Sequence, residues 1–326
     1  MTRYIGLDGH SKTSTFVTMN EKGKLLEQKQ VVTCERELLE FVREQKGKKK
    51  LVFEESHLSQ WLYTLLLPEV DELVVCHPGY LAKRQGPKND LRDAIHVANE
   101  LRCGHVIPVF HDPGRMMELR SLMSGYQDLV QDIVRSKNRY KSLFRSEAIQ
   151  VPGVGVYRSR DRIGELSRRT DRFIAEHLFD RIQYLEQQKK VYSERFRQNM
   201  KKHPDIKRLA GLPGIDTVRA HVIATIICSP ARFLNKHKLW SYSMLVKHDQ
   251  QSDGKSYGKV KIHGRSELKE AFLGAAESIL QTTDTSLKKY YQDQIDKGIG
   301  HRNAKIALAR KVAAICLAVL KSNETV

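Results

Sequence analysis

The spacing of apolar residues changes near residue 111, and this change constrains the fold more than any other feature of the sequence. Before it, short apolar runs of strand length alternate with segments of helical spacing. After it, apolar residues recur every three or four positions over long stretches. The two patterns predict an α/β domain at residues 1–110, a helical coiled-coil middle at residues 111–204 and a mostly α domain at residues 205–326.

The first domain is predicted to contain a mixed sheet covered by helices. Three strands are expected close together, and strands then alternate with helices. The expected strands are residues 4–7, 15–19, 25–32, 50–53, 72–76 and 106–110, and the expected helices are residues 35–44 and 88–103.

The middle segment carries two stripes of apolar residues at heptad-like spacing. The first stripe comprises Leu119, Leu122, Tyr126, Leu129, Ile133, Tyr140 and Leu143, and the second Leu178, Ile182, Leu185, Tyr192 and Phe196. Such stripes indicate two long helices, with a turn between them at residues 149–160. The helices can form a hairpin that packs only on itself or an oligomerising coiled coil, and the sequence leaves both open.

The third domain begins with a short helix, a Pro-Gly turn and a second helix within residues 209–227. This segment is similar to a helix-hairpin-helix, in which backbone N–H groups contact a DNA phosphate. Asp216 would cap the second helix, but its charge would repel a phosphate, so phosphate binding and pure packing are equally open. Residues 232–269 hold nine Lys or Arg against three acidic residues and predict a flexible basic loop. A last helix is expected at residues 302–321.

Composition points to a polyanionic partner. Lys and Arg total 56 against 38 Asp and Glu, which leaves a net charge of +18 and favours nucleic acid over an anionic membrane. The longest apolar run has nine residues, Val312–Leu320, against the ~20 that a membrane-spanning helix needs. The five cysteines form no CxxC pair, which argues against a zinc or disulfide framework and is typical of a reducing cytoplasm. The first ten residues do not have the pattern of a signal peptide.

Four carboxylates stand at positions from which they could converge. Asp8 and Glu54 each end an apolar strand, and Asp90 and Asp93 lie three apart on one face of a predicted helix. Carboxylates gathered in this way repel one another unless cations neutralise them, and Mg²⁺ prefers oxygen ligands. Each residue alone is weak support, because strand-end Asp residues are commonly caps or turn residues. His10 and His57 are close to these acids in sequence and could line the same site.

The chain resembles the DEDD transposases with a RuvC-like N-terminal domain, which are recombinases of one group of bacterial insertion sequences and relatives of Piv-type DNA invertases. The resemblance rests on IGLD (5–8), FEES (53–56), KNDLRDA (88–94), the LPGI turn and the later serine–glycine basic stretch. It implies an RNase H-like first domain. It also implies that Asp8, Glu54, Asp90 and Asp93 are the four acidic residues that bind Mg²⁺, with Glu55 a one-residue alternative to Glu54.

The resemblance further implies a serine nucleophile in the stretch SDGKSYGKVKIHGRSELKEAF (252–272). Ser252 preserves the family's spacing to Gly258 and is the first choice, and Ser256 is the second. The stretch departs from the family pattern at Asp253, where a glycine usually follows the serine. Family members form a covalent phosphoserine link, work as dimers and tetramers in the bacterial cytoplasm, and use an element-encoded guide RNA that pairs with donor and target DNA.

Three other functions fit parts of the same sequence. A RuvC-like nuclease would use the four carboxylates with water as the nucleophile. An ATP-binding protein of the actin-like and sugar-kinase type also opens with a strand ending in Asp and Gly, but needs a second phosphate loop that this sequence does not show. A non-catalytic nucleic-acid-binding protein would use the acidic residues only structurally.

Overall fold

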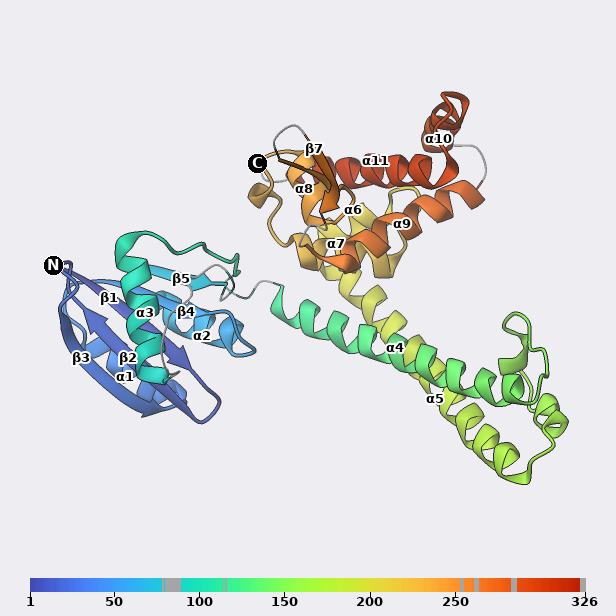
Figure 1. Ribbon diagram of the computed structural model, residues 1–326, viewed down its shortest axis with the longest axis horizontal. Helices are drawn as coiled ribbons and strands as arrows, with labels where there is room; N and C mark the ends of the chain where they lie inside the picture. The colour runs from blue at the N-terminus through green and yellow to red at the C-terminus, as the bar shows by residue number, and fades with distance from the viewer. Residues whose placement is uncertain are drawn as a thin grey trace. The chain divides into compact units, whose positions relative to one another are not determined.

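The chain forms two compact units, Met1–Met116 and Met117–Val326 (Figure 1). The computed structural model describes residues 1–77, 79, 89–112, 114, 116–252, 255–260, 264–282 and 286–322. The mixed α/β unit is followed by a mostly helical one, which confirms the predicted order of classes and is consistent with an RNase H-like first domain. The finer division at residues 110 and 204 stays a prediction.

A five-stranded sheet forms the centre of the first unit. Its order is β3-β2-β1-β4-β5, and the strands are β1 (Thr2–Gly9), β2 (Thr13–Met19), β3 (Leu25–Val32), β4 (Lys48–Glu54) and β5 (Glu72–Cys76). The first three strands pair antiparallel, whereas β4 runs parallel to β1 and to β5. The predicted mixed sheet is therefore confirmed.

Helices cover both faces of this sheet (Figure 1). α1 (Glu35–Glu44), α2 (Ser59–Leu66) and the short 3₁₀ helix η1 (Leu67–Glu69) follow one another on one face, and α3 (Asp90–Cys103) lies on the other. Successive residues of a strand point to opposite faces, so the strands are buried on both sides. Leu7 and Phe53 pack toward α1 and α2, while Val17 and Val52 pack toward α3.

α3 lies directly on the backbone of β1 at Gly6. A Cβ atom built there would lie 2.1 Å from the carbonyl oxygen of Ala94 and 2.9 Å from the Cβ of Ala98. Only a glycine allows this approach, because the atom in the way belongs to the helix backbone and cannot rotate aside. The small residues of IGLD and of α3 thus set the height of the helix above the sheet.

The second unit begins with two long helices, α4 (Met117–Ser146) and α5 (Arg169–Lys202), which pack side by side (Figure 1). The two 3₁₀ helices η3 (Gly155–Tyr157) and η4 (Asp161–Glu165) lie in the connection between them. Tyr140 and Phe144 are fully buried against Phe179 and Ile182. The predicted helical hairpin is therefore present. Its core includes Tyr140 and Ile182 of the predicted stripes, together with Phe144 and Phe179, which follow the partly buried stripe residues Leu143 and Leu178.

Shorter elements complete the second unit. They are α6 (Pro204–Ala210), α7 (Thr217–Ile227), η5 (Pro230–Arg232), α8 (Lys236–Tyr242), β6 (His248–Ser252), β7 (Lys255–Val260), α9 (Ser266–Gln281), α10 (Ser286–Asp296) and α11 (His301–Lys321). The prediction of a flexible loop at residues 232–269 is wrong for the described part of that stretch. It contains α8, an antiparallel hairpin of β6 and β7, and the start of α9.

One predicted strand is also absent. Residues 106–110 form only an isolated bridge between Pro108 and Cys76, with one further backbone hydrogen bond from Val109 to Val75. Proline has no N–H group to donate, so the run cannot continue a ladder there. Among the described residues, no helix is both long and apolar enough to span a membrane.

The Pro-Gly turn between α6 and α7 has a packing role. Gly214 has a φ of +76°, and a Cβ there would lie 2.4 Å from the carbonyl oxygen of Ala275 in α9. Asp216 caps α7 by accepting a hydrogen bond from the Arg219 backbone N–H at 2.8 Å, and its carboxylate pairs with the Arg219 guanidinium at 3.0 Å. The same guanidinium donates to Ser278 of α9. The turn is therefore anchored on α9.

Candidate active site

Strand register places Asp8 beside Glu54. β1 and β4 run parallel, and Leu7 pairs with Phe53, so the next residue of each strand reaches the same edge of the sheet. Because Leu7 and Phe53 face α1 and α2, alternation turns Asp8 and Glu54 toward the opposite face, which α3 covers. The two strand-end carboxylates thus lie on one face at one edge.

The other two acids lie in the first turn of α3. Asn89 caps the helix by accepting a hydrogen bond from the Leu91 backbone N–H at 2.8 Å. Asp90 and Asp93 follow within the first turn, where the helix dipole favours negative charge. Since α3 rests on Gly6, two residues before Asp8, the first turn of the helix comes close to the end of β1.

His10 lies between two of these acids. Its Nε2 is 3.3 Å from Oδ2 of Asp8 and 3.8 Å from Oδ1 of Asp90. One ligand atom from each of Asp8, His10 and Asp90 lies within 4.8 Å of the others. This cluster of carboxylate oxygens and an imidazole nitrogen has the donor chemistry of a divalent-metal site. The sequence drew attention to His10 only through its nearness to Asp8 along the chain.

The electrostatics of Asp8 reflect this crowding. Burial raises the pKa of its carboxyl, and the negative charges of Asp90 and Asp93 raise it further, while His10 acts in the opposite direction. Asp93 therefore acts on Asp8 through its charge. On β5, the strand beyond β4, burial raises the pKa of the Cys76 thiol to about 12, and the charge of Glu54 contributes. A bound divalent cation would relieve the repulsion among the acids.

Both candidate serines lie in the β6–β7 hairpin of the second unit. Ser252 is the last residue of β6 and pairs with Lys255, and Ser256 in β7 pairs with Gln251. The structure describes the backbone of these residues but not their side chains, and Asp253 lies outside the described residues. The choice of nucleophile therefore stays a prediction.

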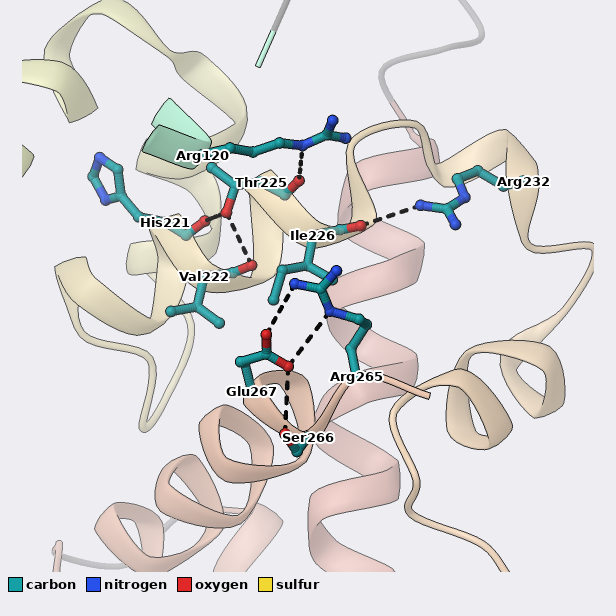
Figure 2. Close-up of polar contacts among 9 residues, drawn as sticks. All are labelled: Arg120, His221, Val222, Thr225, Ile226, Arg232, Arg265, Ser266 and Glu267. Carbon is teal, nitrogen blue, oxygen red and sulfur yellow. Dashed lines mark hydrogen bonds and ion pairs between the residues drawn. The ribbon is translucent and has the colours of Figure 1, made fainter. Parts of the chain in front are cut away.

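Arginine side chains gather at the end of α7, as Figure 2 shows. Arg120 of α4 donates to the carbonyl oxygen of Thr225 at 3.2 Å, and Arg232 donates to that of Ile226 at 3.2 Å. Guanidinium groups at a helix C-terminus satisfy carbonyls that have no partner within the helix. Arg265, which belongs to the basic stretch that carries the candidate serines, is paired with Glu267 at 2.9 Å, and half of its side chain is exposed.

Two family models match the chain over separate segments. A DEDD transposase model matches residues 5–147, which contain all four acids, and a model of the transposase IS116/IS110/IS902 family matches residues 206–292, which contain the β6–β7 hairpin. Transposase domains of the DEDD type generally use a divalent metal, and the chain has a suitable acidic and histidine cluster. No curated protein matches the chain. The two models together cover more than two-thirds of the sequence and place the chain among the insertion-sequence DNA transposases of the IS110/IS116/IS902 type.

Proposed function

We propose that the protein cleaves and rejoins DNA strands with Mg²⁺ held by Asp8, Glu54, Asp90 and Asp93. The observation that carries the proposal is the close grouping of Asp8, His10 and Asp90, with the charge of Asp93 acting on the same carboxyl. The metal would supply positive charge at the scissile phosphate. The protein's own contribution would be to hold the acids at the ends of β1 and β4 and at the start of α3, with the sheet positioning the strand ends and the close contact at Gly6 positioning α3.

The proposed nucleophile is Ser252. Its hydroxyl oxygen forms a bond to the phosphorus of the scissile phosphodiester and loses its proton, while the bond from phosphorus to the 3′ oxygen breaks. The 3′ oxygen takes up a proton and leaves as a 3′-hydroxyl, so the phosphate remains on the serine. Reversal by another 3′-hydroxyl joins a new strand. The assignment is motivated by the resemblance of residues 252–272 to the family's serine-containing stretch, and the basic character of that stretch supports it.

Two further parts of the proposal concern partners. We propose a guide RNA encoded by the element, which would pair with donor and target DNA while the protein contacts phosphates. The net charge of +18 supports an extended polyanionic partner. We also propose that two copies form a dimer and two dimers a tetramer, with the metal site and the serine supplied by different chains.

A covalent adduct tests the nucleophile. Incubation with Mg²⁺, donor and target DNA and RNA transcribed from the element's flanks should yield a protein–DNA adduct that survives denaturation. Ser252→Ala should remove the adduct and the joined product, because no hydroxyl remains to attack the phosphorus. Ser266→Ala, at an exposed serine of the same basic stretch, should leave both unchanged. An adduct that persists in Ser252→Ala and disappears in Ser256→Ala would transfer the role to Ser256.

Metal binding can be tested by thermal unfolding. Burial and the neighbouring acids raise the pKa of Asp8 in the folded protein, so ionised Asp8 disfavours folding above that pKa. This cost disappears as the pH falls through the raised pKa. At neutral pH and without metal, Asp8→Asn should therefore melt a few degrees higher than the wild type. Mg²⁺ should raise the melting temperature of the wild type but not of Asp8→Asn. Equal responses to Mg²⁺ would contradict the site.

A hydrolytic nuclease is the second candidate, and one observation favours it. Asp8, His10 and Asp90 all belong to the first unit, which therefore contains a metal-ligand cluster without any residue of the second. With water as the nucleophile, the products would be cut strands with no protein attached. Cleavage of DNA without an adduct, unaffected by Ser252→Ala and Ser256→Ala, would establish this alternative.

A further inference from the structure

A polar hollow of about 510 Å³ lies beside the acid cluster, on the face of the sheet that α3 covers. Its lining includes Thr15 of β2, Gln28 and Gln30 of β3, and Asn89 and Asp90 at the start of α3. Asp90 thus borders both the metal-ligand cluster and the hollow. The volume is in the range of small-molecule binding sites. Neither strand exchange through Ser252 nor hydrolysis by water gives these glutamines a role.

Strand register connects the hollow to the cluster. Asp8 pairs with Thr15, and Thr15 pairs with Gln30, so these three residues form one row across β1, β2 and β3. Residues in one row point to the same face, and neighbouring strands lie about 4.8 Å apart. Gln30 is therefore two strand spacings from Asp8, or roughly 10 Å along the row. That separation suits a ligand with one group at the cluster and an adjoining group in the hollow.

The chemistry of the lining favours a neutral, hydrogen-bonding ligand. The side chains of Gln28 and Gln30 can each donate and accept hydrogen bonds, and the hydroxyl of Thr15 can do both. The carboxylate of Asp90 would repel a phosphate in the hollow. The lysine that borders it, Lys29, has its Nζ 4.0 Å from a carboxylate oxygen of Glu44. A nucleobase matches this lining, because its edge presents both donors and acceptors and glutamine amides pair with base edges.

We propose that the hollow receives one unpaired nucleobase of the DNA strand whose phosphate lies at the acid cluster. The proposal rests on the proposed function, since it takes the cluster as the site of strand cleavage. A base inside the duplex stack could not enter the hollow, so the nucleotide next to the scissile phosphate must be unstacked. Gln28 and Gln30 would then hydrogen-bond its edge and fix the position of the phosphate relative to Asp8.

Binding to DNA with single abasic positions tests this proposal. All proteins carry Asp93→Ala, so the DNA strands stay intact, and affinity is measured in the presence of the element's RNA. Removal of the base from one nucleotide next to the scissile phosphate should weaken binding about tenfold. Gln28→Ala/Gln30→Ala should weaken binding to intact DNA by a similar factor and show no further loss with the abasic DNA.

The control is Gln45→Ala, because Gln45 lies at the end of α1 and its amide donates to Glu27 and to the Phe41 carbonyl. Gln45→Ala should lose affinity at the same abasic positions, and by the same factors, as the protein that carries Asp93→Ala alone. The proposal is contradicted if no abasic position beside the scissile phosphate weakens binding. It is also contradicted if the affinity losses caused by the glutamine substitutions and by the abasic site are additive. The wild-type protein could also fail to cut or join DNA while the glutamine substitutions still abolish the affinity loss at the abasic position. That result would support the hollow as a nucleobase site and contradict the proposed function.

Discussion

Asp93→Ala is expected to abolish strand exchange while leaving nucleic-acid binding nearly unchanged, and Asp8→Ala is expected to do the same. Both residues belong to the acid group at the end of β1 and the start of α3. Loss of a carboxylate there weakens metal binding, and a metal at a phosphoryl centre contributes several kcal/mol of charge stabilisation, so the rate should fall roughly a thousandfold or more. Gel analysis of joined product measures exchange, and a mobility-shift titration measures binding.

Strand exchange and nucleic-acid binding should respond differently to these substitutions, because they depend on different parts of the chain. Binding to a polyanion arises from many Lys and Arg side chains, and removal of one acid raises the net charge rather than lowering it. Glu40→Ala is the matched control, because Glu40 is an exposed carboxylate of α1 on the other face of the sheet. It should leave exchange intact. Full strand-exchange activity in Asp93→Ala or Asp8→Ala would contradict the proposed metal site.

The sequence was sufficient for elements with strong boundary signals. Residues 25–32, 35–44 and 72–76 have the predicted bounds, because polar or turn-forming residues flank each of these segments. The nearness of Asp8 to Asp90 also follows from reasoning on position. That Glu54 and Asp93 complete the same metal site stays a prediction. Residues that end strands of one sheet meet at its edge, and a helix that packs across the sheet can bring its first turn there.

The sequence was insufficient where polar residues form regular structure. β6 has the sequence HDQQS, which lacks the alternation of a half-buried strand, so only the pairing with β7 defines it. Gln28 and Gln30 are similar, because a glutamine on an edge strand has the same local pattern whether it borders a hollow or open solvent. Their significance depends on α3, which lies some 60 positions further along the chain.

The position of His10 shows the same limit. Five histidines are spread over residues 1–110, and their spacing does not distinguish one from another. The nearness of His10 to both Asp8 and Asp90 arises because β1 ends at Gly9 and α3 begins at Asp90 beside it. Contacts between residues 80 positions apart depend on tertiary packing, which local pattern does not encode.

Gly6→Ala should destabilise the first unit and reduce activity together. The added Cβ would lie 2.1 Å from the Ala94 carbonyl oxygen, so α3 must move away from the sheet, and Asp90 and Asp93 move with it. Overpacking against backbone should cost about 3 kcal/mol. That cost corresponds to a fall of roughly 10 °C or more in the melting temperature of this unit.

Scanning calorimetry of the full chain, together with the strand-exchange assay, measures both effects of Gly6→Ala. Gly155→Ala makes the same chemical change where a Cβ would meet nothing within 4 Å, so it should alter neither stability nor exchange. If Gly6→Ala lowers the melting temperature but an assay run well below that temperature gives full exchange, the height of α3 above the sheet does not set the position of the acids. Because the close contact at Gly6 is the physical link between the packing of α3 and the geometry of the cluster, that outcome would require Asp90 and Asp93 to reach Asp8 by a different arrangement.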